Sequence, residues 1–163
     1  MVIHFQESRL SHQDLSQLRF RDLKAGDRFH LGERALTREE IMEFASRYDP
    51  QPFHLDDAAA KAHPLFERMS ASGWHTALIS QILIADFWKR TKVRGLAGAG
   101  VSEIKWATPV YSDESLSCEM ELEMVRASAS KPELGLIRMC VKLSKADGQL
   151  ATLLRITGVF AND

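Results

Sequence analysis

What this sequence has little of excludes several classes of protein. Only two cysteines, Cys118 and Cys140, occur among its 163 residues, and they do not form a C-x-x-C pair. Both fall at apolar positions of predicted strands, so we expect two reduced thiols in the core of a cytoplasmic protein. The formal net charge is only -1, and charges of both signs are interspersed without a basic block. Binding to nucleic acid or to an anionic membrane surface is therefore not expected.

Long apolar runs are also missing. The N-terminus "MVIHFQESRLSHQDLSQ" has neither the basic start nor the apolar stretch of a secretory signal. The longest apolar stretch, residues 77–88, is interrupted by Ser80, Gln81 and Asp86 and is far shorter than the roughly 20 residues that span a bilayer. We therefore expect a soluble, cytoplasmic protein that does not insert into a membrane.

The composition that remains is that of an ordinary globular protein, with 45% apolar and 26% charged residues. A chain of this length can form one domain with a hydrophobic core, and it is too short for two domains of ordinary size. Residues 1–24 are polar and weakly periodic, so we interpret them as an N-terminal extension. A single domain is expected over residues 25–163.

Two helices are predicted in the first half of the chain. Thr37 and Glu40 form a T-x-x-E capping box, and Pro50 ends the apolar stripe that follows. Asp49 therefore lies at a helix end, and an Ala-rich turn follows at residues 57–62. The second helix begins at Gly73 and runs to about Arg90 with almost no polar face, so we expect it to be buried on most sides. The stripe of the first helix consists of Ile41, Phe44, Ala45 and Tyr48.

The second half of the chain predicts strands. Residues 115–124 alternate strictly between apolar and polar side chains, as does the segment around 137–143, which indicates a sheet with one dry face. Asp147-Gly148 marks a turn before a strand at 150–160, and further strands are expected within 24–36 and over 100–111, ending near Pro109. Short connections favour antiparallel pairing. We therefore predict an α+β hot-dog fold, in which a curved antiparallel sheet wraps around one long helix.

The segment "DPQPFHLD" places Asp49 and His54 in a stretch stiffened by two prolines. An Asp and a His held together can act as an acid/base pair, since His titrates near neutral pH and the carboxylate orients it. Alternatively, Asp49 caps a turn and His54 is a packed loop residue. Gly73 also has two interpretations: its N–H at a helix start can form an oxyanion hole, or it only makes a tight turn.

Other polar and aromatic residues nearby are weaker candidates. His54 and Asp56 form an H-x-D pair that could hold a cation with Asp49, but a third ligand at typical spacing is missing, so we predict that the chain binds no metal. His75 is a further candidate acid or base, or lines the pocket. Trp74 and Trp106 are interpreted mainly as packing residues, with bordering an acyl pocket as the alternative.

These stretches together resemble the MaoC-like dehydratases, the family that contains the R-specific enoyl-CoA hydratases. The family signature D-x-N-P-x-H-x-D is similar to residues 49–56, and a glycine that opens the hot-dog helix matches Gly73. The resemblance implies that Asp49 and His54 are catalytic and that the Gly73 N–H holds the thioester carbonyl. It also extends to "IKWATPVYSDESLSCEMEL", where four residues match a strand-pair motif of the family: Pro109, Val110, Asp113 and Leu116.

The chain departs from the family pattern at several positions. Gln51 replaces the usual Asn, and Ser72-Gly73-Trp74 replaces the usual H-G-M. Family members often have a serine further along this helix that supports the catalytic Asp; in this sequence the matching residue is Ser80 or Gln81. We expect four residues to contact substrate: Gln51, Phe53, Trp74 and His75.

The function that the resemblance implies is reversible hydration of a trans-2-enoyl thioester, or dehydration of a 3-hydroxyacyl thioester. The acyl carrier is expected to be CoA or an acyl-carrier protein, and no cofactor is expected because the thioester already acidifies the neighbouring carbon. An open sheet edge predicts a homodimer, with a dimer of dimers as an extension. Two other functions stay open: a hot-dog thioesterase using a helix carboxylate such as Asp86, and a non-catalytic acyl-thioester binder or structural partner subunit.

Overall fold

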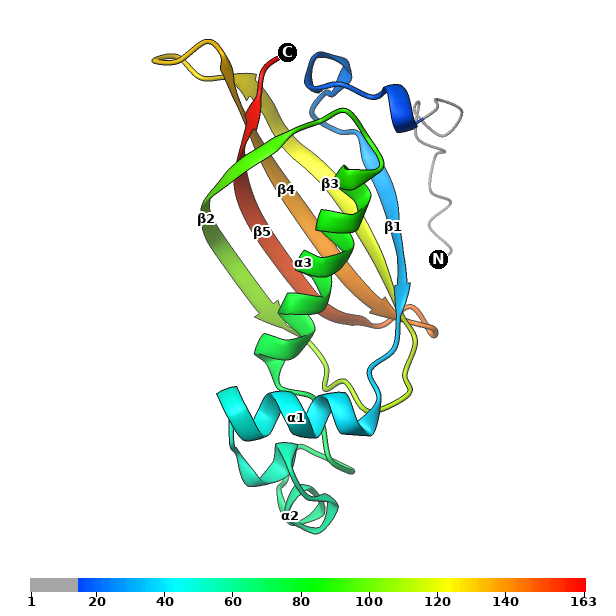
Figure 1. Cartoon of the computed structure of the whole chain (residues 1–163). Helices are drawn as coiled ribbons and strands as arrows, with labels where there is room; N and C mark the ends of the chain where they lie inside the picture. Colours follow the sequence, from blue (N-terminus) through cyan, green and yellow to red (C-terminus); the bar gives the residue numbers. More distant parts are fainter. Residues whose placement is uncertain (1–14) are drawn as a thin grey trace.

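A curved five-stranded antiparallel sheet wraps around one long helix in the computed structural model, which describes residues 15–163 (Figure 1). The spatial order of the strands is β1-β3-β4-β5-β2, so β1 and β2 form the two edges. This arrangement confirms the predicted hot-dog fold. The strands are β1 (Arg28–Arg34), β2 (Gly95–Trp106), β3 (Leu116–Ala127), β4 (Leu134–Lys145) and β5 (Leu150–Ala161).

The helices agree closely with the capping signals. Helix α1 (Arg38–Tyr48) begins with the predicted capping box, in which Thr37 Oγ1 accepts the N–H of Glu40 at 3.2 Å. Helix α3 (Gly73–Lys89) begins at the predicted glycine and lies across the sheet. The segment expected to be an Ala-rich turn is a short helix instead, α2 (Asp57–Ala62), because the Asp56 carboxylate accepts the N–H of Ala59 at 2.8 Å and caps it.

Strand β2 is shifted from its predicted position. It was expected at residues 100–111 but covers Gly95–Trp106. Three glycines within it, at positions 95, 98 and 100, suppress the apolar alternation by which strands are recognised, and the pairing with β5 shifts register at three places. The start of this strand is therefore visible in its backbone pairing and not in its side-chain pattern.

The core lies between α3 and the concave face of the sheet. Alternate residues of β3 are buried there as predicted, and both cysteines are buried and free. Phe29 of β1 contacts Phe87 and Trp88 at the end of α3, with ring centroids 4.8 and 6.5 Å apart. Among residues 15–163, no helix is both long and apolar enough to cross a bilayer.

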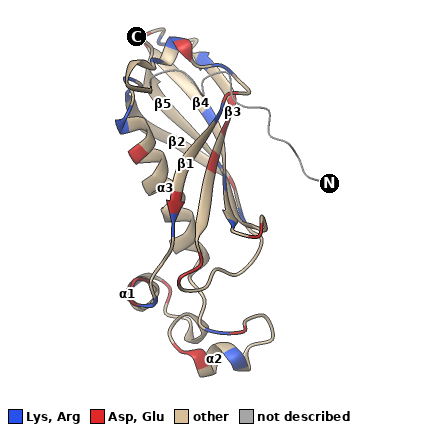
Figure 2. Cartoon of the chain, turned by 90° about the vertical axis from the view of Figure 1, so that its right-hand side faces the viewer, with Lys and Arg blue, Asp and Glu red and all other residues tan. Residues whose placement is uncertain are grey.

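Helix α3 is less buried than its composition predicted. Its sheet-facing side is covered, but Trp74, Leu78 and Ile82 are 55%, 50% and 43% exposed. One sheet covers only one side of a helix, and the side view in Figure 2 shows α3 along one face of the sheet. Within a single chain the opposite apolar side of α3 therefore stays open. On the neighbouring strand β2, three large apolar side chains are also exposed: Leu96, Val101 and Trp106.

Part of the predicted N-terminal extension packs against the domain. Residues 15–24 contribute Leu18, Phe20 and Leu23 to the core, all at most 5% exposed, while residues 1–14 lie outside the described residues. The ring of Phe20 presses on Gly135 of β4, where an added Cβ would lie only 2.1 Å from Phe20 Cζ. This contact requires a glycine at position 135.

We predict that Gly135→Ala lowers the free energy of unfolding by about 1–3 kcal/mol, the usual cost of overpacking a core contact. Urea unfolding followed by circular dichroism measures this. Gly98→Ala is the matched control, because a Cβ at Gly98 meets nothing within 4 Å. In a Phe20→Leu background the Gly135→Ala penalty is expected to shrink, and an undiminished penalty there contradicts the assigned contact.

Candidate active site

Asp49 and His54 are brought together at one end of α3 by the turn between α1 and α2. Asp49 caps the end of α1, where its N–H donates to the carbonyl of Ala45 at 3.0 Å. The chain then makes a short 3₁₀ turn, Pro52–His54, in which the carbonyl of Gln51 accepts the N–H of His54 at 2.9 Å. His54 Nε2 lies 3.5 Å from Asp49 Oδ2. The five-residue spacing therefore produces a real side-chain pair.

His54 is held in one orientation by a buried segment just before α3. Its Nδ1 lies 2.8 Å from the carbonyl oxygen of Ser70 and 3.2 Å from Ser70 Oγ. A carbonyl oxygen only accepts hydrogen bonds, so Nδ1 carries a proton, and in the neutral imidazole the lone pair is therefore on Nε2, the nitrogen that faces Asp49. The His54 side chain is only 8% exposed and the Asp49 side chain 22% exposed.

A serine that the sequence analysis did not select supports Asp49. Ser72 Oγ donates to Asp49 Oδ2 at 2.7 Å and accepts the N–H of Trp74 at 3.2 Å. The prediction that Ser80 or Gln81 supports the Asp is wrong, because both lie about two turns, roughly 12 Å, along α3. The available signal was the N-cap position of Ser72, directly before the predicted helix start.

Gly73 is fixed by a neighbouring tryptophan. Its φ is not positive, so a special turn is not the reason for a glycine here. A Cβ at this position would lie 2.6 Å from Trp106 Cε2, and the Trp106 ring meets the Trp74 ring edge to face at 5.2 Å. Both tryptophans are about half exposed and border the start of α3. The Gly73 N–H belongs to the first turn of the helix and forms no hydrogen bond within it.

The remaining predicted residues take different positions. Phe53 packs edge to face on His54 at 4.6 Å and stacks on Phe66, so it borders the imidazole. The Gln51 side chain is exposed, and its backbone builds the turn. His75 stacks on Phe44 of α1 at 4.4 Å, with an interplanar angle of 11°.

No group of three metal-ligating side chains is assembled within residues 15–163. The carboxylate of Asp56, the third member of the possible cation set, is engaged in capping α2. Asp86 lies on an exposed part of α3 and pairs with Lys89 at 3.0 Å. It stands thirteen residues beyond Gly73, about 20 Å along the helix, and so does not join the Asp49–His54 pair.

The family model described as "MaoC like domain" matches residues 24–136. The chain belongs to the MaoC-like domain family. A MaoC-like dehydratase structure from Rhodospirillum rubrum is 30% identical, with a TM-score of 0.76 over 88% of this chain and 96% of that one. The Bacillus subtilis protein YdeM is 25% identical over 127 residues, covering 74% of this chain and 86% of YdeM.

A further solved structure shares the fold of this MaoC-like domain. The (R)-hydratase from A. caviae involved in PHA biosynthesis is 22% identical, with a TM-score of 0.63 over 85% of this chain and 96% of that one. Likeness at this level of identity shows the fold alone. The family membership and the R. rubrum relative, a MaoC-like dehydratase, associate the domain with dehydratases in general.

His75 makes the stability of this domain depend on pH. Burial lowers the pKa of His75 below its ordinary value, opposed in part by Glu40 and reinforced by Arg34. Because the unfolded chain then binds a proton at higher pH than the folded chain, we predict that stability falls as the pH drops below about 6.5. Urea unfolding between about pH 7.5 and pH 5 is expected to show a shallower decline in His75→Gln than in wild type.

The control is His30→Gln, which alters an exposed histidine of β1 and should keep the wild-type decline. Equal slopes for wild type and His75→Gln would contradict the role assigned to the buried imidazole.

Proposed function

We propose that this MaoC-like domain catalyses reversible hydration of a trans-2-enoyl thioester, or dehydration of the matching 3-hydroxyacyl thioester. The observation that carries the proposal is the pair of proton acceptors, Asp49 Oδ2 and His54 Nε2, 3.5 Å apart. Each is oriented by a buried serine, and the pair lies beside the N-terminus of α3. This combination offers two side chains that can accept protons from a water molecule and a backbone N–H that can donate a hydrogen bond to a carbonyl oxygen.

The orientation of His54 supports a direct role for one water molecule. With the proton on Nδ1, Nε2 and the Asp49 carboxylate are both acceptors, so one water can donate a hydrogen bond to each. The water oxygen adds to C3 of the enoyl group while its proton passes to this pair. A proton from the pair then bonds to C2, so that the net change is addition of H and OH across the double bond.

The start of α3 is suited to the charge that develops on the thioester. Addition at C3 places negative charge on the carbonyl oxygen, as an enolate. A helix N-terminus offers unpaired N–H groups and the positive end of the helix dipole, and Ser72 Oγ occupies only the N–H of Trp74. The Gly73 N–H is then the donor to the enolate oxygen. The reaction as written forms one C–O bond at C3 and moves protons between water, the Asp49–His54 pair and C2, so it needs no metal or redox cofactor.

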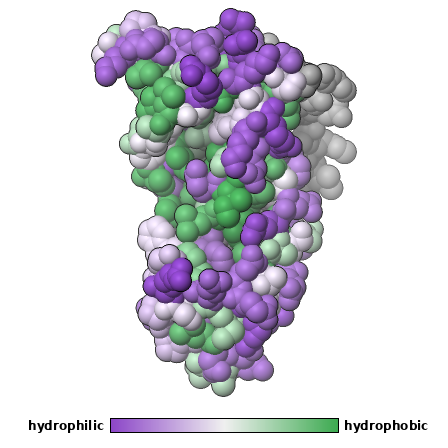
Figure 3. Space-filling model, in the orientation of Figure 1, coloured by the Kyte–Doolittle hydropathy of each residue, from purple (hydrophilic) through white to green (hydrophobic). Residues whose placement is uncertain are grey.

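The apolar side of α3 and the edge strand β2 support the proposal of a homodimer. Large apolar side chains gather over α3 and along β2 on the face shown in Figure 3. In addition, the outer edge of β2 leaves backbone groups unpaired in the sheet order. A second copy placed by a two-fold axis covers the apolar side and continues the sheet. A dimer of dimers and a cytoplasmic location stay predictions.

Two other functions fit the site less well than hydration. A thioesterase using Asp86 is disfavoured, because that carboxylate is exposed, paired with Lys89 and far from the pair formed by Asp49 and His54. A non-catalytic acyl-thioester binder, or a structural partner subunit, would account for the exposed apolar surfaces. It would not account for the close approach of Asp49 Oδ2 and His54 Nε2. Substrate carriage by CoA or by an acyl-carrier protein is compatible with the same site.

We predict that His54→Ala and Asp49→Asn each lower kcat/KM by about 10²–10⁴-fold, the usual contribution of a general acid or base. Loss of the ultraviolet absorbance of the conjugated enoyl group, measured over a panel of enoyl-CoA chain lengths, reports the reaction. Ser72→Ala is expected to cost less, about 10-fold to 100-fold, because it loosens Asp49 without removing it.

Asp86→Asn is the matched control and is expected to keep full activity. Release of free thiol that depends on Asp86 would replace hydration with thioester hydrolysis. If the protein binds acyl-CoA tightly without turnover, and His54→Ala binds equally well, hydration is rejected and the non-catalytic binding function is supported.

We also predict that Val101→Lys produces monomers, because it places a charge in the proposed interface on the exposed edge strand. Sedimentation equilibrium of wild type and variant measures the change. Leu65→Lys is the matched control, since Leu65 is 71% exposed in the segment after α2, away from β2 and α3. A monomeric wild type, or a variant that stays dimeric, would place the interface elsewhere.

A further inference from the structure

Trp106, the last residue of β2, lies against the first residue of α3. A Cβ added to Gly73 would lie 2.6 Å from Trp106 Cε2, 2.7 Å from Nε1 and 2.8 Å from Cδ2. These three nearest atoms all belong to the five-membered ring of the indole, the ring that carries the N–H. The polar edge of Trp106 is therefore the part that meets the start of α3, although packing against a glycine does not require an N–H.

The sheet holds Trp106 in this position. Trp106 of β2 pairs with Thr152 of β5. Thr152 Oγ1 lies 3.0 Å from Thr76 Oγ1 in the first turn of α3, so this part of β5 faces the helix. Residues directly opposite each other in an antiparallel pair direct their side chains to the same face of the sheet. Trp106 thus faces the start of α3 from a regular strand and not from a loop.

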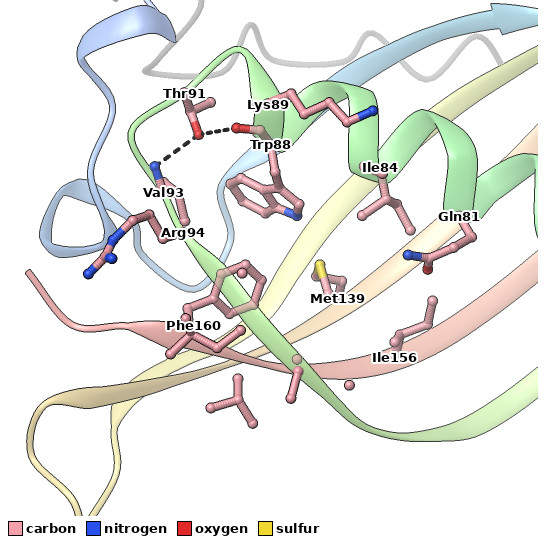
Figure 4. A pocket seen from close by; sticks show the side chains of 17 residues that line it. Gln81, Ile84, Trp88, Lys89, Thr91, Val93, Arg94, Met139, Ile156 and Phe160 are labelled. Carbon is pink, nitrogen blue, oxygen red and sulfur yellow. Dashed lines mark hydrogen bonds between the residues drawn. The ribbon is translucent and has the colours of Figure 1, made fainter.

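The indole N–H of Trp106 is free and accessible. Trp106 is 47% exposed, and its Nε1–H forms no hydrogen bond with the residues that the structure describes. Trp88 differs in this respect. Its ring lines an apolar cavity of about 570 Å³ between the C-terminal half of α3 and strands β2, β4 and β5 (Figure 4), but its nitrogen is covered by protein atoms. A ligand can reach the Trp106 donor and cannot reach that of Trp88.

The Trp106 N–H lies close enough to the Gly73 N–H for both to bind one oxygen atom. Backbone geometry places a Cβ about 2.5 Å from its own backbone nitrogen, so Gly73 N and Trp106 Nε1 are at most about 5 Å apart. Two N–H groups that donate to the same oxygen, each with a donor–acceptor distance of about 2.9 Å, have nitrogens separated by at most about 6 Å. The observed separation lies within this limit.

We propose that the Trp106 indole N–H is a second hydrogen-bond donor to the thioester carbonyl oxygen, beside the Gly73 N–H. The proposal rests on the proposed function, which places that oxygen at the start of α3. Trp106 contacts the substrate as a donor only and neither gains nor loses a proton. Negative charge on the oxygen grows as the enolate forms, so this hydrogen bond strengthens in the transition state and acts on kcat more than on KM.

The first test is Trp106→Phe, which keeps an aromatic ring and loses the N–H. With enoyl-CoA substrates, kcat is expected to fall about 10-fold to 100-fold while KM changes much less, the pattern of a lost oxyanion donor. Tyr48→Phe is the matched control, because it removes one polar hydrogen from an exposed aromatic ring at the end of α1. This control is expected to keep the wild-type kcat. Sedimentation of each variant checks that assembly is unchanged.

A second variant separates the N–H from the packing of the ring. Site-specific replacement of the Trp106 indole by a benzothiophene ring puts sulfur in place of the N–H and keeps the bicyclic shape. The loss of kcat is expected to match that of Trp106→Phe. Full activity with benzothiophene, together with a loss in Trp106→Phe, would show that only ring packing matters and would overturn the proposal.

A binding measurement that needs no turnover distinguishes this proposal from the proposed function. A saturated acyl-CoA labelled with ¹³C at the thioester carbonyl binds without being hydrated, and infrared spectroscopy reports the polarisation of that carbonyl. Binding to wild type is expected to shift the carbonyl stretch to lower frequency, with a smaller shift in Trp106→Phe and the full shift in Tyr48→Phe.

A shift that depends on Trp106, in a protein that hydrates no enoyl-CoA, supports the second donor and overturns hydration. Hydration with the same kcat and the same carbonyl shift in wild type and Trp106→Phe overturns the second donor and leaves hydration standing.

Discussion

The candidate site depends on the three residues Ser70–Ser72, which run in extended form between two other parts of the chain. The N–H of Ser70 donates to the carbonyl of Phe53 at 3.2 Å, and that of Ala71 donates to the carbonyl of Val110 at 2.7 Å. The Ser70 carbonyl orients His54, while the Ser72 hydroxyl orients Asp49. All three residues are at most 6% exposed. Because their polar groups have partners only in this one arrangement, the segment fixes the acid/base pair and the start of α3 at once.

This constraint explains how reactive groups can lie on a turn without being loose. The turn at Pro52–His54 has little regular structure of its own, but aromatic contacts of Phe53 with His54 and Phe66 support it from the other side. Asp57 fastens the next segment, since its carboxylate accepts the N–H of Met69 at 2.8 Å, and this hydrogen bond lowers the Asp57 pKa. Catalysis by proton transfer needs such fixed geometry, because a misplaced base loses most of its effect.

The sequence predicted the elements whose signals are local. The capping box of α1, the glycine at the start of α3 and the alternation in β3 each depend on residues a few positions apart, and each is found where expected. The position of β2 and the role of Ser72 were missed, since both depend on partners distant in the chain: β5 for the strand and Asp49 for the serine. The prolines suggested that Asp49 and His54 are held close together, but spacing alone left a turn cap and a packed histidine as the alternative, and only the resemblance to the family signature favoured an acid/base pair.

Helix α3 shows that an apolar sequence alone does not reveal what each side of a helix contacts. Its residues face three environments: the sheet beneath Ile79 and Phe87, the open side at Leu78 and Ile82, and the cavity at Ile84 and Trp88. All three demand apolar side chains, so composition cannot separate them. Geometry can, because an exposed apolar side calls for a second protein surface, whereas a recessed apolar cavity has room only for a small apolar group. The same helix therefore borders the candidate active site, the apolar cavity and the surface of the proposed dimer interface.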